Sequence, residues 1–171
     1  MSGHPGPDGL LARPTHAGAR DFYVCDAEGL RALVRLPSGW AGTGQVFLGQ
    51  AVFDFRAPLS KNEFSLLLAD VLLARTRRQS VWRTVYEAEI RAEVLGRSAP
   101  LMLRLAGHSG LVSRHTVEAL GADGNAQPLG EIRREGIFRR RVRLHLSREL
   151  PLLAQVYLLT VALTLWQRQG A

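Results

Sequence analysis

The chain has 171 residues, of which 46% are hydrophobic and 22% are charged, a balance typical of a single folded domain. Its 22 Lys and Arg residues outnumber its 15 Asp and Glu residues, which gives a net charge of +7. This charge favours nucleic acid, anionic lipid or an acidic protein as the partner. The only cysteine, Cys25, excludes an intramolecular disulfide and suits a reducing compartment, so we expect a cytoplasmic location, peripheral at the membrane if lipid is the partner.

The first 20 residues, MSGHPGPDGLLARPTHAGAR, are rich in Gly, Pro and His. They contain neither the basic region nor the apolar region of a signal peptide. We predict that residues 1–20 form a disordered tail and that residues 21–171 form one domain.

Strand signals follow this segment. Residues 22–25 and 30–36 flank the turn Asp26-Ala27-Glu28-Gly29, a pattern that predicts a β-hairpin. Residues 45–56 (QVFLGQAVFDFR) are also strand-like, and Gly49 within them is expected to mark a bulge or a close contact.

A helix is predicted next, because Ser60-Lys61-Asn62-Glu63 has the form of a capping box. The apolar residues after it recur at helical spacing, and they are Phe64, Leu67, Leu68, Val71 and Leu72. Arginines follow at positions 75, 77 and 78, which suits the negative end of a helix dipole. The pattern predicts a helix over residues 61–78.

Alternating apolar and polar residues then predict a series of short antiparallel strands. The clearest alternation runs through residues 80–94, with Trp82, Tyr86 and Ile90 on the buried side. An Asp-Gly pair at 123–124 predicts a hairpin turn. The further strands are expected within residues 101–106, 114–120, 129–135 and 138–146.

The last apolar segment, residues 150–166 (LPLLAQVYLLTVALTLW), has 17 positions without a charge. A helix that is apolar on every side must be enclosed by protein or by lipid. It would span about 25 Å, less than the roughly 30 Å of a hydrocarbon core. Enclosure by protein is therefore favoured, and a C-terminal tail anchor is the alternative. The side chains expected to be buried are Leu152, Val156, Leu159, Leu163 and Trp166.

The order of segments at the C-terminus supports a family resemblance. The strand PLGEIRRE (128–135), a Gly turn, the basic strand FRRRVRLHL (138–146), a polar break and the apolar helix follow one another. This order, together with the strand–turn–strand unit VCDAEGLRALVRL (24–36), resembles the tubby-like superfamily, which includes the LURP-one-related proteins and the phospholipid scramblases. The scramblases carry an Asp-rich stretch before the terminal helix, whereas residues 145–149 here hold a single carboxylate. Calcium regulation is therefore not implied.

The resemblance implies a closed β-barrel around a hydrophobic C-terminal helix, and it implies lipid as a partner. We expect a mainly β (α+β) fold. It would consist of an antiparallel β-barrel that encloses the apolar C-terminal helix, with one additional mid-chain helix.

Catalytic and metal motifs are not found. Gly107-His108-Ser109-Gly110 resembles a nucleophile elbow, but Leu111 stands where that pattern needs glycine. The histidines lack metal-ligand spacing, and there is no second cysteine for a zinc site. His108 and His115 are interpreted as surface histidines. We therefore expect no enzyme activity, no metal and no cofactor.

The strongest functional signal is a cluster of arginines within eleven residues. It consists of Arg133, Arg134, Arg139, Arg140, Arg141 and Arg143. At strand spacing, Arg139, Arg141 and Arg143 share one face, about 6.5–7 Å apart, and form what we call the arginine ridge. Such a row matches phosphates of lipid headgroups or nucleic acid. The alternative is a solvated strand face that prevents edge-to-edge pairing.

We therefore predict a non-enzymatic module that contacts anionic membrane lipid, or another anionic partner, through an arginine-rich strand face. The alternatives are a nucleic-acid or acidic-protein binder and a tail-anchored membrane protein. The ridge has no aromatic residues between its arginines, which argues against stacking on single-stranded nucleic acid.

Overall fold

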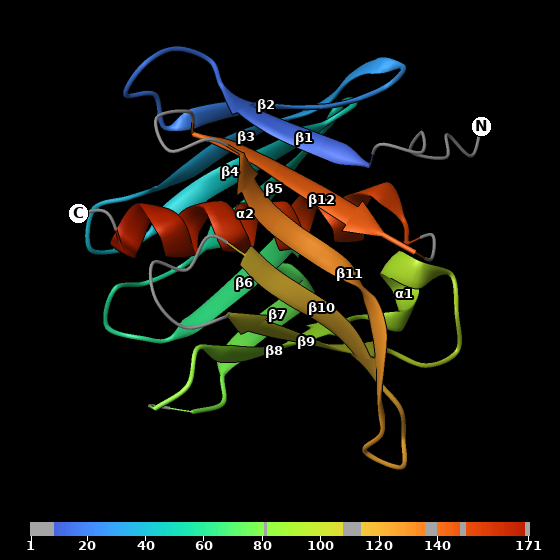
Figure 1. Ribbon diagram of the computed structural model, residues 1–171. Helices are drawn as coiled ribbons and strands as arrows, with labels where there is room; N and C mark the ends of the chain where they lie inside the picture. Colours follow the sequence, from blue (N-terminus) through green and yellow to red (C-terminus); the bar gives the residue numbers. More distant parts are fainter. Residues whose placement is uncertain (1–8, 81, 108–113, 136–139, 148–149, 170–171) are drawn as a thin grey trace.

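The computed structural model describes residues 9–80, 82–107, 114–135, 140–147 and 150–169. Within these residues, twelve antiparallel strands close into a single barrel, because each strand pairs with its sequence neighbour and β1 pairs with β12 (Figure 1). The strands are β1 (Leu10–Pro14), β2 (Asp21–Asp26), β3 (Gly29–Ser38), β4 (Thr43–Leu48), β5 (Ala51–Arg56), β6 (Glu63–Leu68), β7 (Val71–Arg78), β8 (Val85–Ile90), β9 (Leu101–Gly107), β10 (Arg114–Leu120), β11 (Ala126–Glu135) and β12 (Arg141–Leu146). The helices are α1 (Ala92–Leu95) and α2 (Leu152–Gln169).

Helix α2 lies inside the barrel, as the red ribbon in Figure 1 shows. All thirteen residues from Ala154 to Trp166 are buried, so no side of the helix meets solvent over that length. The mainly β fold with an enclosed C-terminal helix is therefore confirmed. Of the side chains expected to be buried, Val156, Leu159, Leu163 and Trp166 are buried, and Leu152 is half-buried.

Enclosure by protein, rather than insertion as a tail anchor, accounts for the uniform apolarity of this segment. Among the described residues, we find no helix that combines the length and the apolar character needed to cross a membrane.

The strands fill the space around α2 because successive side chains of a strand point to opposite faces. On β12, Val142 and Leu144 are buried while Arg141 and Arg143 are not. On β2, Phe22 and Val24 are buried in the same way. The inward side chains of all the strands meet those of α2 in one continuous apolar core.

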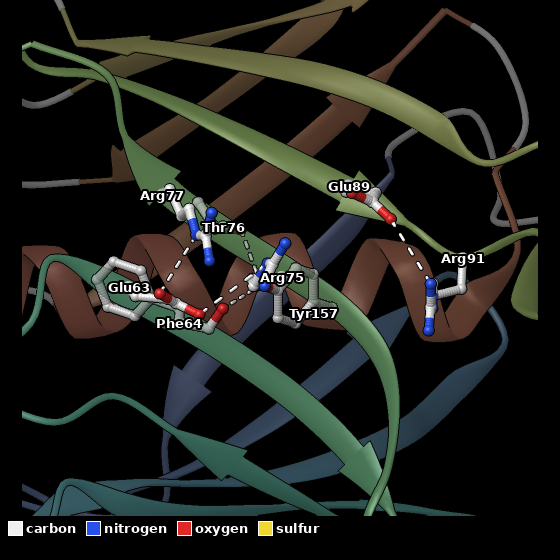
Figure 2. A network of polar contacts seen from close by, with 8 residues as sticks. All are labelled: Glu63, Phe64, Arg75, Thr76, Arg77, Glu89, Arg91 and Tyr157. Carbon is white, nitrogen blue, oxygen red and sulfur yellow. Dashed lines mark hydrogen bonds and ion pairs between the residues drawn. The ribbon is translucent and has the colours of Figure 1, made fainter.

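The polar side chains of α2 find partners inside the core. The hydroxyls of Thr160 and Thr164 donate to backbone carbonyls four residues earlier. The Tyr157 hydroxyl donates to the carbonyl of Phe64 on β6, at 3.2 Å, and shares a 2.8 Å hydrogen bond with Thr76 on β7 (Figure 2). Burial raises the pKa of Tyr157 above its usual value, so this hydroxyl stays neutral and links the helix to two strands.

The predicted helix over residues 61–78 is wrong, because this segment is the hairpin β6–β7. Ala69 and Asp70 have φ values of 47° and 66°, which form a two-residue hairpin turn. Phe64 and Leu66 point inward at strand spacing, and Leu67 is buried as well, beside a register shift that leaves Leu73 of β7 as the extra residue. The apolar residues of this leucine-rich hairpin therefore recur at the spacing that is typical of a helix.

On its outer face, this hairpin carries ion pairs instead of a helix surface. Figure 2 shows Glu63 on β6 between Arg75 and Arg77 of β7. The Nε of Arg77 lies 3.2 Å from the Glu63 carboxylate, and that of Arg75 lies 4.0 Å from it. Glu63, predicted to complete a capping box, therefore takes part in cross-strand pairs on the barrel wall.

The predicted N-terminal tail is wrong for residues 10–14, which form β1 and close the barrel between β2 and β12. Residues 1–8 lie outside the described residues. Residues 45–56 form the hairpin β4–β5 rather than one strand, and Gly49, with a φ of +60°, lies in its turn.

The strand predicted over residues 80–94 is shorter than expected. Only Val85–Ile90 form β8, with Tyr86 and Ile90 buried as predicted. Trp82 was expected on the buried side, but it is 95% exposed because it lies in the connection before β8. Residues 92–95 form α1, which has no buried residue.

Candidate functional site

The outward face of β10, β11 and β12 carries a row of arginines that crosses the strands. Arg114 on β10 lies opposite Arg133 on β11, and Arg133 lies opposite Arg143 on β12. Neighbouring strands are about 4.8 Å apart, so the three side chains leave the barrel close together. Arg141 on β12 and Arg13 on β1 extend this cationic surface. We call these five residues the arginine face.

Two glutamates partly neutralise the arginine face. Glu131 lies 3.1 Å from the Nε of Arg114, and Glu135 accepts a 2.5 Å hydrogen bond from the Nε of Arg143. That hydrogen bond, together with the charges of Arg133 and Arg141, holds the pKa of Glu135 below its usual value. Glu135 therefore stays ionised and fixes the orientation of Arg143.

The other three arginines of the face are not held in an ion pair of this kind. Arg13, Arg133 and Arg141 form no ion pair with any carboxylate in the described part of the chain. Arg13 and Arg133 are exposed, and Arg141 is half-buried. Like charges repel one another, so this surface gains most from an anion that approaches from solvent.

A hollow of about 740 Å³ adjoins the arginine face where β1, β2 and β12 meet the β1–β2 connection. It is lined by Arg13, Pro14, Thr15, Ala17, Gly18, Tyr23, Arg140 and Arg141. The lining thus combines three guanidinium groups with a threonine and a tyrosine hydroxyl. These are the donor types that bind phosphate oxygens.

Arg140 has a structural contact as well. Its guanidinium donates a 2.9 Å hydrogen bond to the carbonyl of Ala19 and lies 5.4 Å from the centre of the Phe22 ring. This bond holds the β1–β2 connection against the start of β12, and so it shapes the hollow.

The structure divides the six predicted arginines. Arg133, Arg141 and Arg143 lie together on the arginine face, as the strand alternation predicts. Arg134 does not belong to it, because it pairs with the inward Val142 and lines a small opening beside Trp166 at the end of α2. Arg139 lies outside the described residues, so the arginine ridge is described only at its other two positions.

Sequence reasoning missed Arg13, Tyr23 and Arg114. Arg13 was assigned to a disordered tail, although the alternation of buried Leu10 and Ala12 in that segment is a strand signal. Arg114 joins the face only through the register of β10 with β11, which a linear pattern does not reveal.

The histidine interpretation is also corrected. His115, expected at the surface, is buried, and its ring centre lies 5.1 Å from that of Trp166. His108 falls outside the described residues, as do Ser109 and Gly110 of the elbow-like sequence. The described residues contain no group of three or more His, Cys, Asp and Glu that could hold a metal ion.

No protein-family model matches the chain, no curated protein matches it, and no solved structure matches it. The barrel-and-helix fold implied by the tubby-like resemblance is present, while membership of that superfamily stays a prediction. The arginine face and the hollow are the features of this structure that indicate a function.

Proposed function

We propose that the protein is a non-enzymatic binding module that contacts anionic membrane lipid through the arginine face. The main support is that Arg13, Arg133 and Arg141 form no ion pair with a carboxylate in the described part of the chain. A guanidinium group presents a planar fork of donors that fits two phosphate oxygens at once. The resemblance to the tubby-like superfamily supports lipid as the source of the phosphate, and we include that relationship in the proposal.

In this proposal the hollow receives one headgroup. Arg13 and Arg141 supply the charge, and the hydroxyls of Thr15 and Tyr23 supply further donors. The row formed by Arg114, Arg133 and Arg143 then attracts neighbouring anionic lipids without holding any of them in a pocket. Binding of this kind is electrostatic and needs no covalent step.

Two properties indicate which leaflet of the membrane the protein would contact. A single cysteine suits a reducing compartment, and the cytoplasmic leaflet carries the anionic lipids of the cell. We therefore propose a peripheral location at the cytoplasmic face of a membrane.

Vesicle sedimentation tests the proposal with a charge-matched pair of variants. Arg133→Glu with Arg141→Glu reverses two charges of the arginine face, and Arg91→Glu with Arg97→Glu reverses two exposed charges near α1. Each basic residue near an anionic membrane contributes about 1 kcal/mol, so the first variant should lose at least tenfold in affinity for phosphatidylcholine vesicles that contain phosphatidylserine. The second should bind much more like the unmodified protein.

Binding can also be measured at different ionic strengths and with uncharged vesicles. Wild-type binding should weaken as ionic strength rises, because the screening length falls to about 8 Å at physiological salt. Vesicles of phosphatidylcholine alone should not bind. Equal binding by the face variant and the wild type would refute the arginine face as the site, and tight binding to duplex DNA without binding to vesicles would identify nucleic acid as the partner instead.

A further inference from the structure

Three large apolar side chains project into solvent from alternate connections of the barrel. Trp40 in the β3–β4 connection is 83% exposed, Leu59 in the β5–β6 connection is 52% exposed, and Trp82 in the β7–β8 connection is 95% exposed. Exposed tryptophans on a folded domain are uncommon, because the side chain has a large apolar area to remove from water. Two of them, with the exposed Leu59 in the connection between theirs, indicate a contact surface.

These connections share one end of the barrel. In an antiparallel meander, alternate connections lie at the same end, so those after β1, β3, β5 and β7 lie together. Figure 1 shows them at the end where α2 finishes and where the C-terminus is marked. We call this end, defined by Trp40, Leu59 and Trp82, the tryptophan end.

Hydrogen bonds fix the backbone of the connections that carry the tryptophans. The Ser80 hydroxyl oxygen accepts from the backbone N–H groups of Trp82 and Arg83, at 3.2 Å each. The N–H of Leu59 donates to the carbonyl of Trp40 at 3.5 Å, which joins the β3–β4 and β5–β6 connections. The backbone at both tryptophans is therefore held by hydrogen bonds within or between these connections.

Gly42 supports the same arrangement. Its φ is +58°, and its N–H donates to the carbonyl of Gly39 while its own carbonyl accepts from Ala57 at 2.7 Å. A Cβ at this position would lie 1.9 Å from the Ala57 carbonyl oxygen, so only glycine fits. The turn that presents Trp40 thus depends on close backbone contact with the next connection.

The tryptophan end is also cationic. Arg20, Lys61 and Arg83 are exposed on it, and its described residues in the connections 15–20, 39–42, 57–62 and 79–84 include no Asp or Glu. The connections at the opposite end carry Arg91 and Arg97 together with exposed carboxylates, which are Glu28, Asp70, Glu93 and Asp123. The two ends therefore differ in both charge and aromatic content.

We propose that the tryptophan end is inserted into the interface of an anionic lipid bilayer, with Trp40, Leu59 and Trp82 below the headgroups and Arg20, Lys61 and Arg83 among them. This inference rests on the proposed membrane binding and gives it an orientation, with the long axis of α2 directed toward the membrane. Tryptophan favours the membrane–water interface, and nearby cations complement anionic headgroups.

The position of the hollow agrees with this orientation. Thr15, Ala17 and Gly18 of its lining belong to the β1–β2 connection, which lies at the tryptophan end. Arg141 is the first residue of β12 at the same end. When Trp40 and Trp82 enter the interface, the hollow and its arginines come to the level of the lipid phosphates.

Tryptophan fluorescence tests the insertion. Trp166, the third tryptophan, is 5% exposed and reports the unchanged interior. Phosphatidylcholine–phosphatidylserine vesicles should shift the wild-type emission to shorter wavelength, and brominated phosphatidylcholine should quench it. The variant Trp40→Phe with Trp82→Phe retains only the buried Trp166 and should respond to neither.

Affinity provides a second measurement. Trp40→Ala with Trp82→Ala should lower the affinity for these vesicles by about tenfold or more, because apolar insertion and charge attraction both contribute to interfacial binding. A matched control removes exposed apolar side chains at the opposite end, where Leu30→Ala with Val71→Ala should leave the affinity unchanged. Both pairs lie in solvent, so unfolding midpoints should stay close to the wild type.

The outcomes separate this inference from the proposed function. Suppose that the Arg133–Arg141 variant loses binding and that bromolipid does not quench Trp40 and Trp82 of the bound wild type. This result would support the arginine face and overturn the insertion. Quenching of both tryptophans in a variant that has lost the arginine face would support the insertion and overturn the arginine face. If the wild-type protein binds no vesicles and self-associates instead, both proposals are overturned.

Discussion

Strand β12 has two different surfaces, because Val142 and Leu144 face α2 whereas Arg141 and Arg143 face outward. The same contrast holds around the barrel, with an interior of apolar contacts and an exterior of cations and ion pairs. Interior positions therefore determine whether the chain folds, and exterior ones are available for binding at little cost to stability. This comparison can be tested by substitutions on each side of the wall.

The largest effect is expected from a charge at the centre of α2. Leu158 is fully buried, so Leu158→Arg would bring an unpaired guanidinium into the apolar core and should cost well over about 4 kcal/mol. We expect no soluble folded protein, as measured by circular dichroism of the soluble fraction. A cooperative unfolding transition close to that of the wild type would contradict the enclosure of α2.

A smaller loss is expected when one buried hydrogen-bond donor is removed. Tyr157→Phe leaves the Thr76 hydroxyl and the Phe64 carbonyl without this partner, and it should cost about 1–3 kcal/mol in chemical denaturation. Tyr23→Phe on the outer wall is the control and should cost far less, because Tyr23 is 38% exposed.

Alkaline titration sharpens this test. Burial raises the pKa of Tyr157 in the folded state, whereas in the unfolded chain it is near 10.0. The stabilisation is therefore complete below pH 10 and is lost as the pH rises above it, since only the unfolded state then releases the proton. Tyr157→Phe should flatten the fall of stability above pH 10, and an unchanged alkaline slope would contradict the role of this residue.

Glu135→Gln should have opposite effects on stability and binding. Removing the carboxylate weakens the bond to Arg143 and should cost at most about 1 kcal/mol, since the pair is partly exposed. The stabilisation is present above the unfolded pKa of 4.5 and is lost as the pH falls, because the folded pKa is lower. Affinity for anionic vesicles should rise a few-fold, and a fall would contradict the arginine face.

The smallest effect is expected at Ser60, which lies in a turn before β6 and does not cap a helix. A lost helix cap would cost about 1 kcal/mol. Since no helix follows, Ser60→Ala should change the free energy of unfolding by less than about 0.5 kcal/mol. A cost as large as that of a lost cap would reopen the helix interpretation of residues 61–78.

The sequence predicted the enclosed helix well because the signal is local. Every position from Leu150 to Trp166 is uncharged in a chain with 21 arginines, and the segment is too short to span a hydrocarbon core, which favoured enclosure by protein. The prediction failed for residues 61–78, where leucines satisfy helical and strand periodicity equally and the turn at Ala69-Asp70 has no glycine or proline signal.

The candidate site was predictable only in part, because some of its residues come together only through strand pairing. Alternation along β12 predicted the outward direction of Arg141 and Arg143. Arg13 and Arg114 join them through strand register, with β1 more than a hundred residues away from β12 in the chain. The tryptophan end likewise arises from topology, because the antiparallel order of β3 to β8 brings Trp40 and Trp82 to the same end.

The place of α2 after all twelve strands has a consequence for synthesis on the ribosome. The strands emerge first, yet the interior that they surround is filled by the segment translated after them. A barrel without α2 would lack most of the contacts of its inward apolar side chains. We therefore expect pairing of β1 with β12 to accompany or follow the docking of α2, and until then the inward faces of the strands stay exposed to chaperones and to aggregation.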